Sequence, residues 1–321
     1  MIRQHGKLTF LSFLLVVLCG NTFAQKIPVI PLDLDSLITV GYATGSLKTL
    51  SGSVEKITEK QMNKDQVTNP LEAIRGRVPG LTIQRGTNGL AALDAVRLRG
   101  TTSLTSGNDP LIIVDGVFGD LSMLTSIYPT DIESFTILKD ASETAQYGSR
   151  GASGVIEVTT KKGMQGRTQV AYNGSFGIST VYKNLKMLSG DEFRSVASER
   201  GISILDKGNN TNFQKEIQQT GLQQNHHVAF YGGSSTSSYR VSLGFMDRQG
   251  VILNEDMKNF TSNMNMNQKM FDGFFDCELG MFGSILKNHN LVDYQKTFYS
   301  AATFNPTYPN HKDPVTNSWD G

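Results

Sequence analysis

The sequence is poor in cysteine, in net charge and in long apolar runs. Two of its 321 residues are cysteines, Cys19 and Cys277, which is too few for a disulfide scaffold. Charged residues make up 18% and the formal net charge is +1, which excludes the polybasic surface typical of nucleic-acid binding. An apolar run at residues 8–19 is shorter than the about 20 residues that a helix needs to span a bilayer. Glycine, by contrast, is abundant at 32 residues and favours β structure with many turns.

The N-terminus has the pattern of a secretory signal peptide. Basic residues precede the apolar run and the small Ala24 follows it, so we predict that residues 1–24 are removed. A lipoprotein anchor at Cys19 is the alternative, but a bulky leucine precedes this cysteine where a small residue is required. After cleavage Cys277 remains alone, and its apolar neighbours predict a packed side chain rather than a nucleophile.

Residues 25–50 form a polar tail that contains one short β-prone segment, Leu37–Tyr42. An exposed segment of this kind tends to aggregate unless another strand pairs with it. It is either the first strand of the next domain or a strand kept available for a partner, which would bind it by β-augmentation.

Residues 51–163 predict a compact α+β unit. A helix is expected to begin near Asn69, with Pro70 at its first position, and to end at Gly76. A turn is expected at Asp115–Gly116. The predicted strands are residues 81–84, 94–100, 110–117, 131–140 and 154–160.

Three evenly spaced glycines stand near the end of this unit: Gly148, Gly151 and Gly154. A phosphate-binding loop runs from a strand through glycines into a helix, because the anion lies on the N-terminus of that helix. Here the order is reversed, since a short helix capped by Asp140 or Ser142 precedes the glycines and a β-branched strand follows them. The glycines therefore predict a tight turn rather than a phosphate site.

After Gly163 the pattern changes to segments of about ten residues in which apolar and polar side chains alternate. Residues 260–270 are the clearest case, with Phe260 and three methionines on one face and Thr, Asn and Lys on the other. Such strands are typical of a membrane β-barrel, and a soluble antiparallel sheet is the alternative. The polar face is rich in Asn, Gln, Ser and Gly, as expected for a water-filled lumen, and a signal peptide precedes these strands. Both features favour the barrel.

The histidines do not predict a metal site. His226 and His227 are adjacent on a predicted strand and therefore point to opposite faces, so we expect neither to have a function. His289 and His311 lack partners at ligand spacing. We find no acid–base pair, nucleophilic triad or cofactor motif, and we predict neither catalysis nor a cofactor.

Several motifs in order resemble the N-terminal part of SusC/RagA-type TonB-dependent outer-membrane transporters. The resemblance covers about Leu37 to Gly321. It is carried by "LITVGYATGSLKTLSGSV", "NPLEAIRGRVPGLTI", "VRLRGTTSLTSGNDPLIIVDGV", "DIESFTILKDASETAQYGSRGASGVIEVTTKKG" and "LQQNHHVAFYGGSSTSSYRVSLGFMDRQGVI".

The resemblance implies a role for each segment: a signal peptide (1–24), a periplasmic tail with a TonB box (25–50), a plug domain (51–163) and the beginning of a barrel (164–321). The implied TonB-binding residues are Leu37, Ile38, Thr39, Val40, Gly41 and Tyr42. Four plug arginines are expected to hold the plug against barrel-wall carboxylates or backbone, unless they are ordinary solvated charges: Arg75, Arg97, Arg99 and Arg150. The implied plug turns are Gly100, Asp115, Gly116, Gly148, Gly151 and Gly154.

The implied function is TonB-dependent import of a glycan or peptide across the outer membrane, together with a SusD-like lipoprotein. The barrel would contact outer-membrane lipid, and the plug and TonB box would be reachable from the periplasm. Twenty-two strands of about ten residues need about 220 residues, more than residues 164–321 supply, so we expect a truncated product or partial sequence. The alternatives are a siderophore or cobalamin receptor without a lipoprotein partner, and a secreted β-sheet binding or adhesion module.

Overall fold

The computed structural model describes residues 37–40, 43–46, 53–63, 69–86, 90, 95–104, 107–291 and 293–311. The predicted signal peptide and the tail up to residue 36 lie outside the described residues, as do Gly41 and Tyr42. Among the described residues, no helix is both long and apolar enough to cross a membrane.

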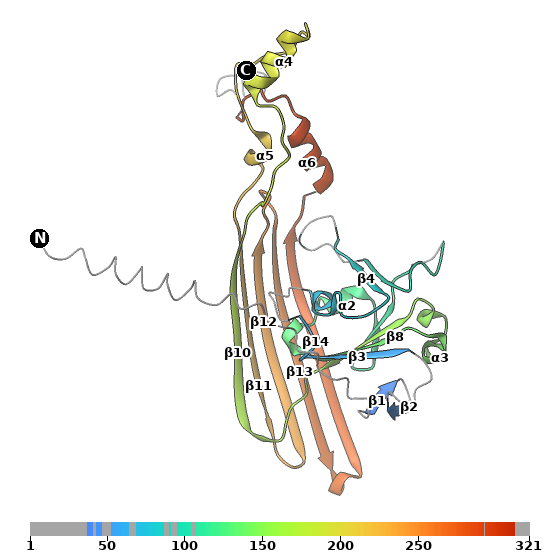
Figure 1. The fold of residues 1–321 in the computed structure, drawn as a ribbon. Helices are drawn as coiled ribbons and strands as arrows, with labels where there is room; N and C mark the ends of the chain where they lie inside the picture. Colours follow the sequence, from blue (N-terminus) through green and yellow to red (C-terminus); the bar gives the residue numbers. More distant parts are fainter. Residues whose placement is uncertain are drawn as a thin grey trace, which may run out of the picture. The chain divides into compact units, whose positions relative to one another are not determined.

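The predicted plug is built on a five-stranded sheet (Figure 1). Its strand order is β3 (Val54–Thr58), β8 (Ile132–Leu138), β9 (Val155–Thr160), β6 (Leu111–Val114) and β7 (Val117–Gly119). Only β6 and β9 pair in parallel, and every residue of β6 is buried, as its continuous apolar sequence predicts. The fully buried side chains of the core include Ile74, Ile112, Phe135 and Ile156. A separate two-stranded sheet joins β4 (Leu81–Gln84) and β5 (Ala95–Leu98).

The helices of the predicted plug are short: η1 (Pro70–Ile74), α2 (Leu121–Leu124), η2 (Pro129–Asp131), α3 (Ala141–Thr144) and η3 (Ala145–Gly151). The Asn69 side chain caps η1 by accepting a hydrogen bond from the backbone amide of Leu71, and Pro70 occupies the first position of the helix. The element is a 3₁₀ helix rather than an α-helix, and it ends at Ile74, before the expected Gly76.

The structure places the three evenly spaced glycines between α3 and β9. Gly148 and Gly154 have positive φ angles of 60° and 89°, which side chains rarely adopt. A Cβ at Gly151 would lie 2.7 Å from the carbonyl oxygen of Thr144. The chain reverses here between a helix and a strand.

The rest of the chain forms five long antiparallel strands in consecutive order: β10 (Gly166–Ser179), β11 (Gly221–Gly233), β12 (Ser237–Gln249), β13 (Asp256–Met270) and β14 (Phe275–His289). The sheet is not closed, and β10 and β14 are its edges. The predicted fold, an α+β plug followed by the first antiparallel strands of an incomplete barrel, is confirmed. Figure 1 shows α4 (Gly190–Glu199), α5 (Phe213–Glu216) and α6 (Tyr294–Thr303) together at one end of this sheet, and η4 (Phe271–Gly273) turns the chain between β13 and β14.

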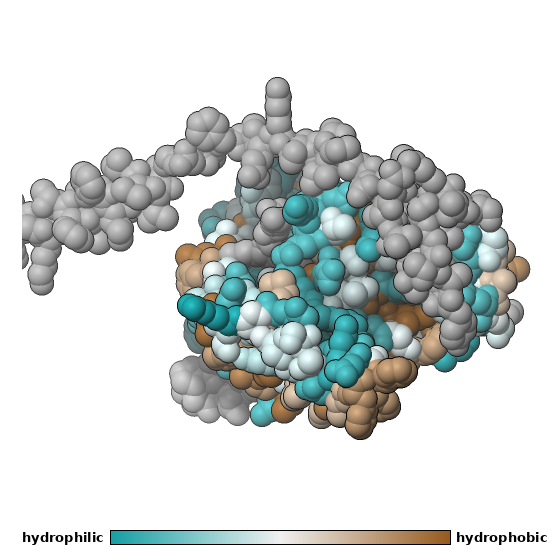
Figure 2. All heavy atoms as spheres, turned by 90° about the horizontal axis from the view of Figure 1, so that it is seen from below, coloured by the Kyte–Doolittle hydropathy of each residue, from teal (hydrophilic) through white to brown (hydrophobic). Residues whose placement is uncertain are grey.

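The long sheet has an outer face and a plug-facing side. On the outer face, exposed apolar side chains run across all five strands and include Val170, Phe176, Phe230, Leu243, Phe245, Phe260, Met281 and Ile285. In Figure 2, hydrophobic residues gather at several places along the rim of the molecule, and hydrophilic residues occupy much of the middle. Cys277 is exposed, not packed as predicted, because alternation places it on the outer face beside Leu279.

Candidate functional site

The plug and the long sheet meet at Asp131, the last residue of η2, which is only 2% exposed. Its carboxylate accepts hydrogen bonds from Arg240 Nη2 at 2.9 Å and from Ser242 Oγ at 2.6 Å. His227 Nε2 lies 3.0 Å from the same carboxylate. Alternation along β11 and β12 places these three wall side chains on the plug-facing side.

The wall contacts keep Asp131 ionised despite its burial. Burial alone raises the pKa of this carboxyl, but the adjacent His227 and the hydrogen bonds from Ser242 and Arg240 outweigh burial and hold the pKa below its usual range. A buried charge of this kind is tolerated only when its partners satisfy it. The site is therefore a paired charge contact between η2 of the plug and the long sheet.

Tyr128, three residues before Asp131, fills the space beside this contact. Its ring stacks on His227 with 4.7 Å between centroids and an angle of 21°. A Cβ at Gly244 would lie 2.4 Å from the Tyr128 ring, so the glycine provides the room for it. Burial, and next the charge of Asp131, raises the pKa of Tyr128 to about 12, so the phenol is neutral.

Weaker polar contacts continue along the same boundary. Asn259 Nδ2 donates to the carbonyl of Thr125 at 3.1 Å, and Asn265 Nδ2 donates to Thr160 Oγ1 at 3.2 Å. Phe282 of β14 packs against the plug core. Strands β11 to β14 thus each contribute side chains to the surface on which the plug lies.

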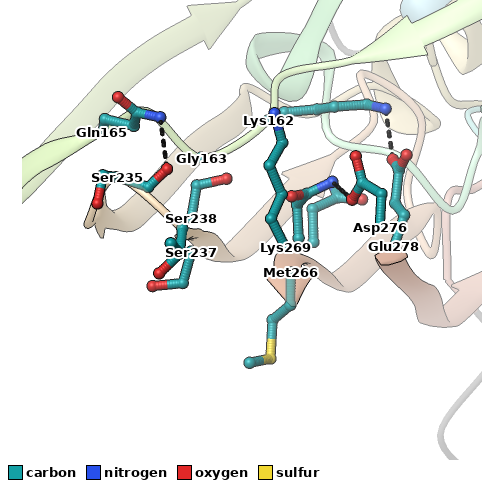
Figure 3. Close-up of a pocket in the computed structure, with 13 residues that line it drawn as sticks. Lys162, Gly163, Gln165, Ser235, Ser237, Ser238, Met266, Lys269, Asp276 and Glu278 are labelled. Atoms are coloured by element: carbon teal, nitrogen blue, oxygen red, sulfur yellow. Dashed lines mark hydrogen bonds and ion pairs between the residues drawn. The ribbon is translucent and has the colours of Figure 1, made fainter. Parts of the chain in front are cut away.

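The chain crosses from plug to wall beside a hollow of about 310 Å³ (Figure 3). Lys162 reaches across this hollow and pairs with Glu278 of β14. Gln165 donates to the carbonyl of Ser235 at 3.2 Å. A Cβ at Gly163 would lie 2.5 Å from the backbone of Tyr239, so the linker is pressed against β12. The C-terminal end of the plug is held to β12, to β14 and to the turn between β11 and β12.

The predicted anchoring arginines have partners inside the plug. Arg97 pairs with Asp109, and Arg99 pairs with Asp140. Arg150 lies over the ring of Phe118 at 5.8 Å, and the carbonyl of Arg75 accepts a hydrogen bond from Asn63. Their role in holding the plug against the wall stays a prediction.

The contact at Asp131 has the opposite polarity to the one expected from the sequence. The plug supplies the carboxylate, and the wall supplies the arginine and the histidine. His226 and His227 do point to opposite faces, but the expectation that His227 has no function overlooked its burial against the plug. The available signal was the polar, plug-facing position of His227 and Arg240 on predicted strands.

The predicted TonB-binding segment begins in a hairpin of its own. β1 (Leu37–Val40) pairs antiparallel with β2 (Ala43–Ser46), and these strands form a separate two-stranded sheet. The plug sheet instead begins with β3. Of the two interpretations of this segment, the structure does not support a first strand of the plug sheet.

Comparisons with known proteins agree with this arrangement. The family model of the TonB-dependent receptor plug domain matches residues 46–155. The chain is 35% identical over 296 residues to the TonB-dependent receptor SusC of Bacteroides thetaiotaomicron, covering 88% of this chain and 29% of that protein. It is 34% identical over 266 residues to the TonB-dependent receptor P3 of Formosa agariphila, covering 83% and 26%.

Among solved structures, the RagAB peptide importer in its open-open state matches with a TM-score of 0.74 and 26% identity. The match covers 81% of this chain and 33% of that one. The chain spans less than a third of the length of the curated relatives it matches. It has the plug and the first wall strands of a TonB-dependent receptor. Within that class it belongs to the SusC/RagA type, whose members are receptors and not enzymes.

Proposed function

We propose that the chain supplies the plug and the first wall strands of a transporter that imports a nutrient across the outer membrane. The observation that carries this proposal is the buried contact of Asp131 with Arg240 and Ser242. Polar bonds of this kind have strict geometry and therefore hold a plug in a defined place. Within the same proposal, the signal peptide directs export and the apolar outer face contacts lipid.

Energy for import would come through the segment Leu37–Tyr42, bound by the periplasmic TonB protein as an added strand. The separate β1–β2 hairpin supports this, because it is not tied into the plug sheet. Pulling would shift the plug while the linker at Lys162 and Gly163 stays on the wall. The four predicted arginines would stabilise the plug, and the glycine turns would keep its shape.

The partner and substrate follow from the relatives. RagAB is described as a peptide importer, and SusC is described as a TonB-dependent receptor. We assign this chain a SusD-like surface lipoprotein as partner and a glycan or peptide as substrate. A lipoprotein that co-purifies with the tagged transporter after detergent extraction is the expected result, and its absence would favour the siderophore or cobalamin type.

In-frame deletion of residues 37–42 tests the energy coupling in a complete transporter that includes this chain. Growth on the imported glycan or peptide as sole source should be lost, while the amount in the outer membrane stays unchanged. Deletion of residues 26–31, an equally long stretch of the same tail, serves as the control and should leave growth intact. Growth that survives the first deletion would contradict the proposal.

A further inference from the structure

Asp140 occupies the N-cap position of α3 but does not cap it. Its backbone is extended, with φ −96° and ψ 149°, yet its side chain makes no capping hydrogen bond. An aspartate at this position ordinarily accepts a hydrogen bond from a backbone amide of the first helical turn. Here the carboxylate accepts a hydrogen bond from the backbone amide of Ser53 at 2.5 Å and pairs with Arg99. The Asp140 carboxylate therefore binds a residue 87 positions earlier in the chain instead of its own helix.

Arg99 is held in an unfavourable backbone conformation at this contact. Its φ is 58°, in the left-handed region that side chains other than glycine seldom adopt. Such conformations persist where the surrounding structure requires them, and they concentrate at functional positions. The Ser53 amide, and next Arg99, keeps the pKa of Asp140 below its usual range, so the carboxylate is ionised.

The Asp140 carboxylate holds Ser53, the residue immediately before β3. This strand is an edge of the plug sheet and pairs only with β8, from Val54 opposite Leu138 to Thr58 opposite Ser134. Farther along the strand, Glu55 pairs with Lys139 at 2.7 Å. Ser53 immediately precedes β3, on the side where the chain arrives from Leu37–Tyr42. Of the described contacts of β3, the Ser53–Asp140 bond is the first that a pull on that segment meets.

We propose that Asp140 is a positioning residue for energy coupling: it clamps β3 in the plug sheet until the Leu37–Tyr42 segment is pulled. This inference rests on the proposed function. An edge strand can leave without breaking the other strand pairs of its sheet, so release of β3 would break only its pairing with β8 among the strands of this sheet. The clamp makes that release depend on force, and the fixed linker at Lys162 and Gly163 provides the opposing anchor.

Release of β3 can be measured as the reactivity of a cysteine introduced at a buried position of this strand. Ile57 is 5% exposed, so Ile57→Cys, in a Cys277→Ser background of the complete transporter, should react slowly with a small maleimide. With proton-motive force the reaction should accelerate, and Asp140→Asn should accelerate it about fivefold further, the effect of one lost hydrogen bond. Asp140→Glu, which keeps the charge, should restore most of the protection.

The matched control is Asp120→Asn, because Asp120 does cap its helix, through the amides of Ser122 and Met123. It should leave labelling unchanged. If the parent labels equally with and without proton-motive force, the proposed function fails and the clamp with it. If the parent responds but Asp140→Asn matches Asp120→Asn, the clamp alone is overturned. Without proton-motive force Asp140→Asn should also label faster than the parent, because the carboxylate no longer holds β3, and equally slow labelling of the two proteins would also overturn the clamp.

Discussion

At the scale of single residues, the contact between plug and wall depends on a carboxylate that no local pattern marks. Asp131 is the first residue of a predicted strand, and nothing in the sequence distinguishes it from other polar residues at strand ends. Its partner Arg240 lies 109 positions away, so only the folded chain joins them. The same holds for Asp140, whose position predicts a helix cap although its carboxylate bonds elsewhere. Charges that act between sheets are fixed by tertiary structure.

Asp131→Asn is expected to loosen the plug. Without the carboxylate, Arg240 remains buried and uncompensated, and breaking a buried pair in this way costs about 3 kcal/mol. The free energy of unfolding in detergent should fall by this amount, and protease should cut the plug sooner. Asp247→Asn removes the surface partner of Lys258, a pair 3.5 Å apart, and should cost less than about 1 kcal/mol. Equal losses in the two variants would contradict a special role for Asp131.

The pH dependence of this contact has a definite sign. Because the folded-state pKa of Asp131 is lowered, its contribution to stability is present above the unfolded value of about 3.9. That contribution is lost as the pH falls through the folded-state pKa. The difference in unfolding free energy between the parent and Asp131→Asn should therefore shrink below about pH 4. Denaturant titrations from pH 3 to pH 8 measure it, and a difference that grows on acidification would contradict the assignment.

At the scale of elements, alternation predicted the long strands because its period fixes which face each side chain takes. Residues 260–270 are the clearest example, since their apolar face is the outer face of β13. The short plug helices were harder to predict. The segment after Asn69 carries a good cap and a first-position proline, yet it forms a 3₁₀ helix of only five residues, because the backbone leaves the helical region at Arg75 with ψ 126°. Tertiary packing, not propensity, decided its length.

Gly244→Ala tests whether β12 needs a glycine to accept the plug. The new Cβ would lie 2.4 Å from Tyr128 and 2.5 Å from Thr261 Oγ1, so the plug must shift. Overpacking of this kind costs about 1–3 kcal/mol, measured as a lower melting temperature of the plug. Gly283→Ala on β14 has no atom within 4 Å of the added carbon and is the matched control. If the melting temperature of the plug is unchanged in Gly244→Ala, Tyr128 can move aside at little cost and β12 does not need the glycine.

At the scale of the whole molecule, the long sheet has two faces that require different surroundings. The plug covers polar side chains such as Asn263 and Asn265, while the outer face leaves Leu243 and Phe260 exposed. On β12 and β13 the apolar side chains of that face end, near one end of the strands, at a charged pair of Asp247 with Lys258. An apolar band bounded in this way is expected to lie in lipid.

Leu243→Arg separates a lipid-facing wall from the surface of a secreted β-sheet module. In a membrane wall an arginine at mid-depth costs about 2–4 kcal/mol, and near the interface about 0–1 kcal/mol. Leu243→Arg should therefore reduce the folded fraction in the outer membrane strongly, whereas Gln249→Arg, at the end of β12 beyond the charged pair, should not. Leu243 is 42% exposed, so on a soluble sheet the same arginine would meet water and cost little. Equal, small effects of the two substitutions would favour the secreted module, because only lipid makes the depth of a charge matter.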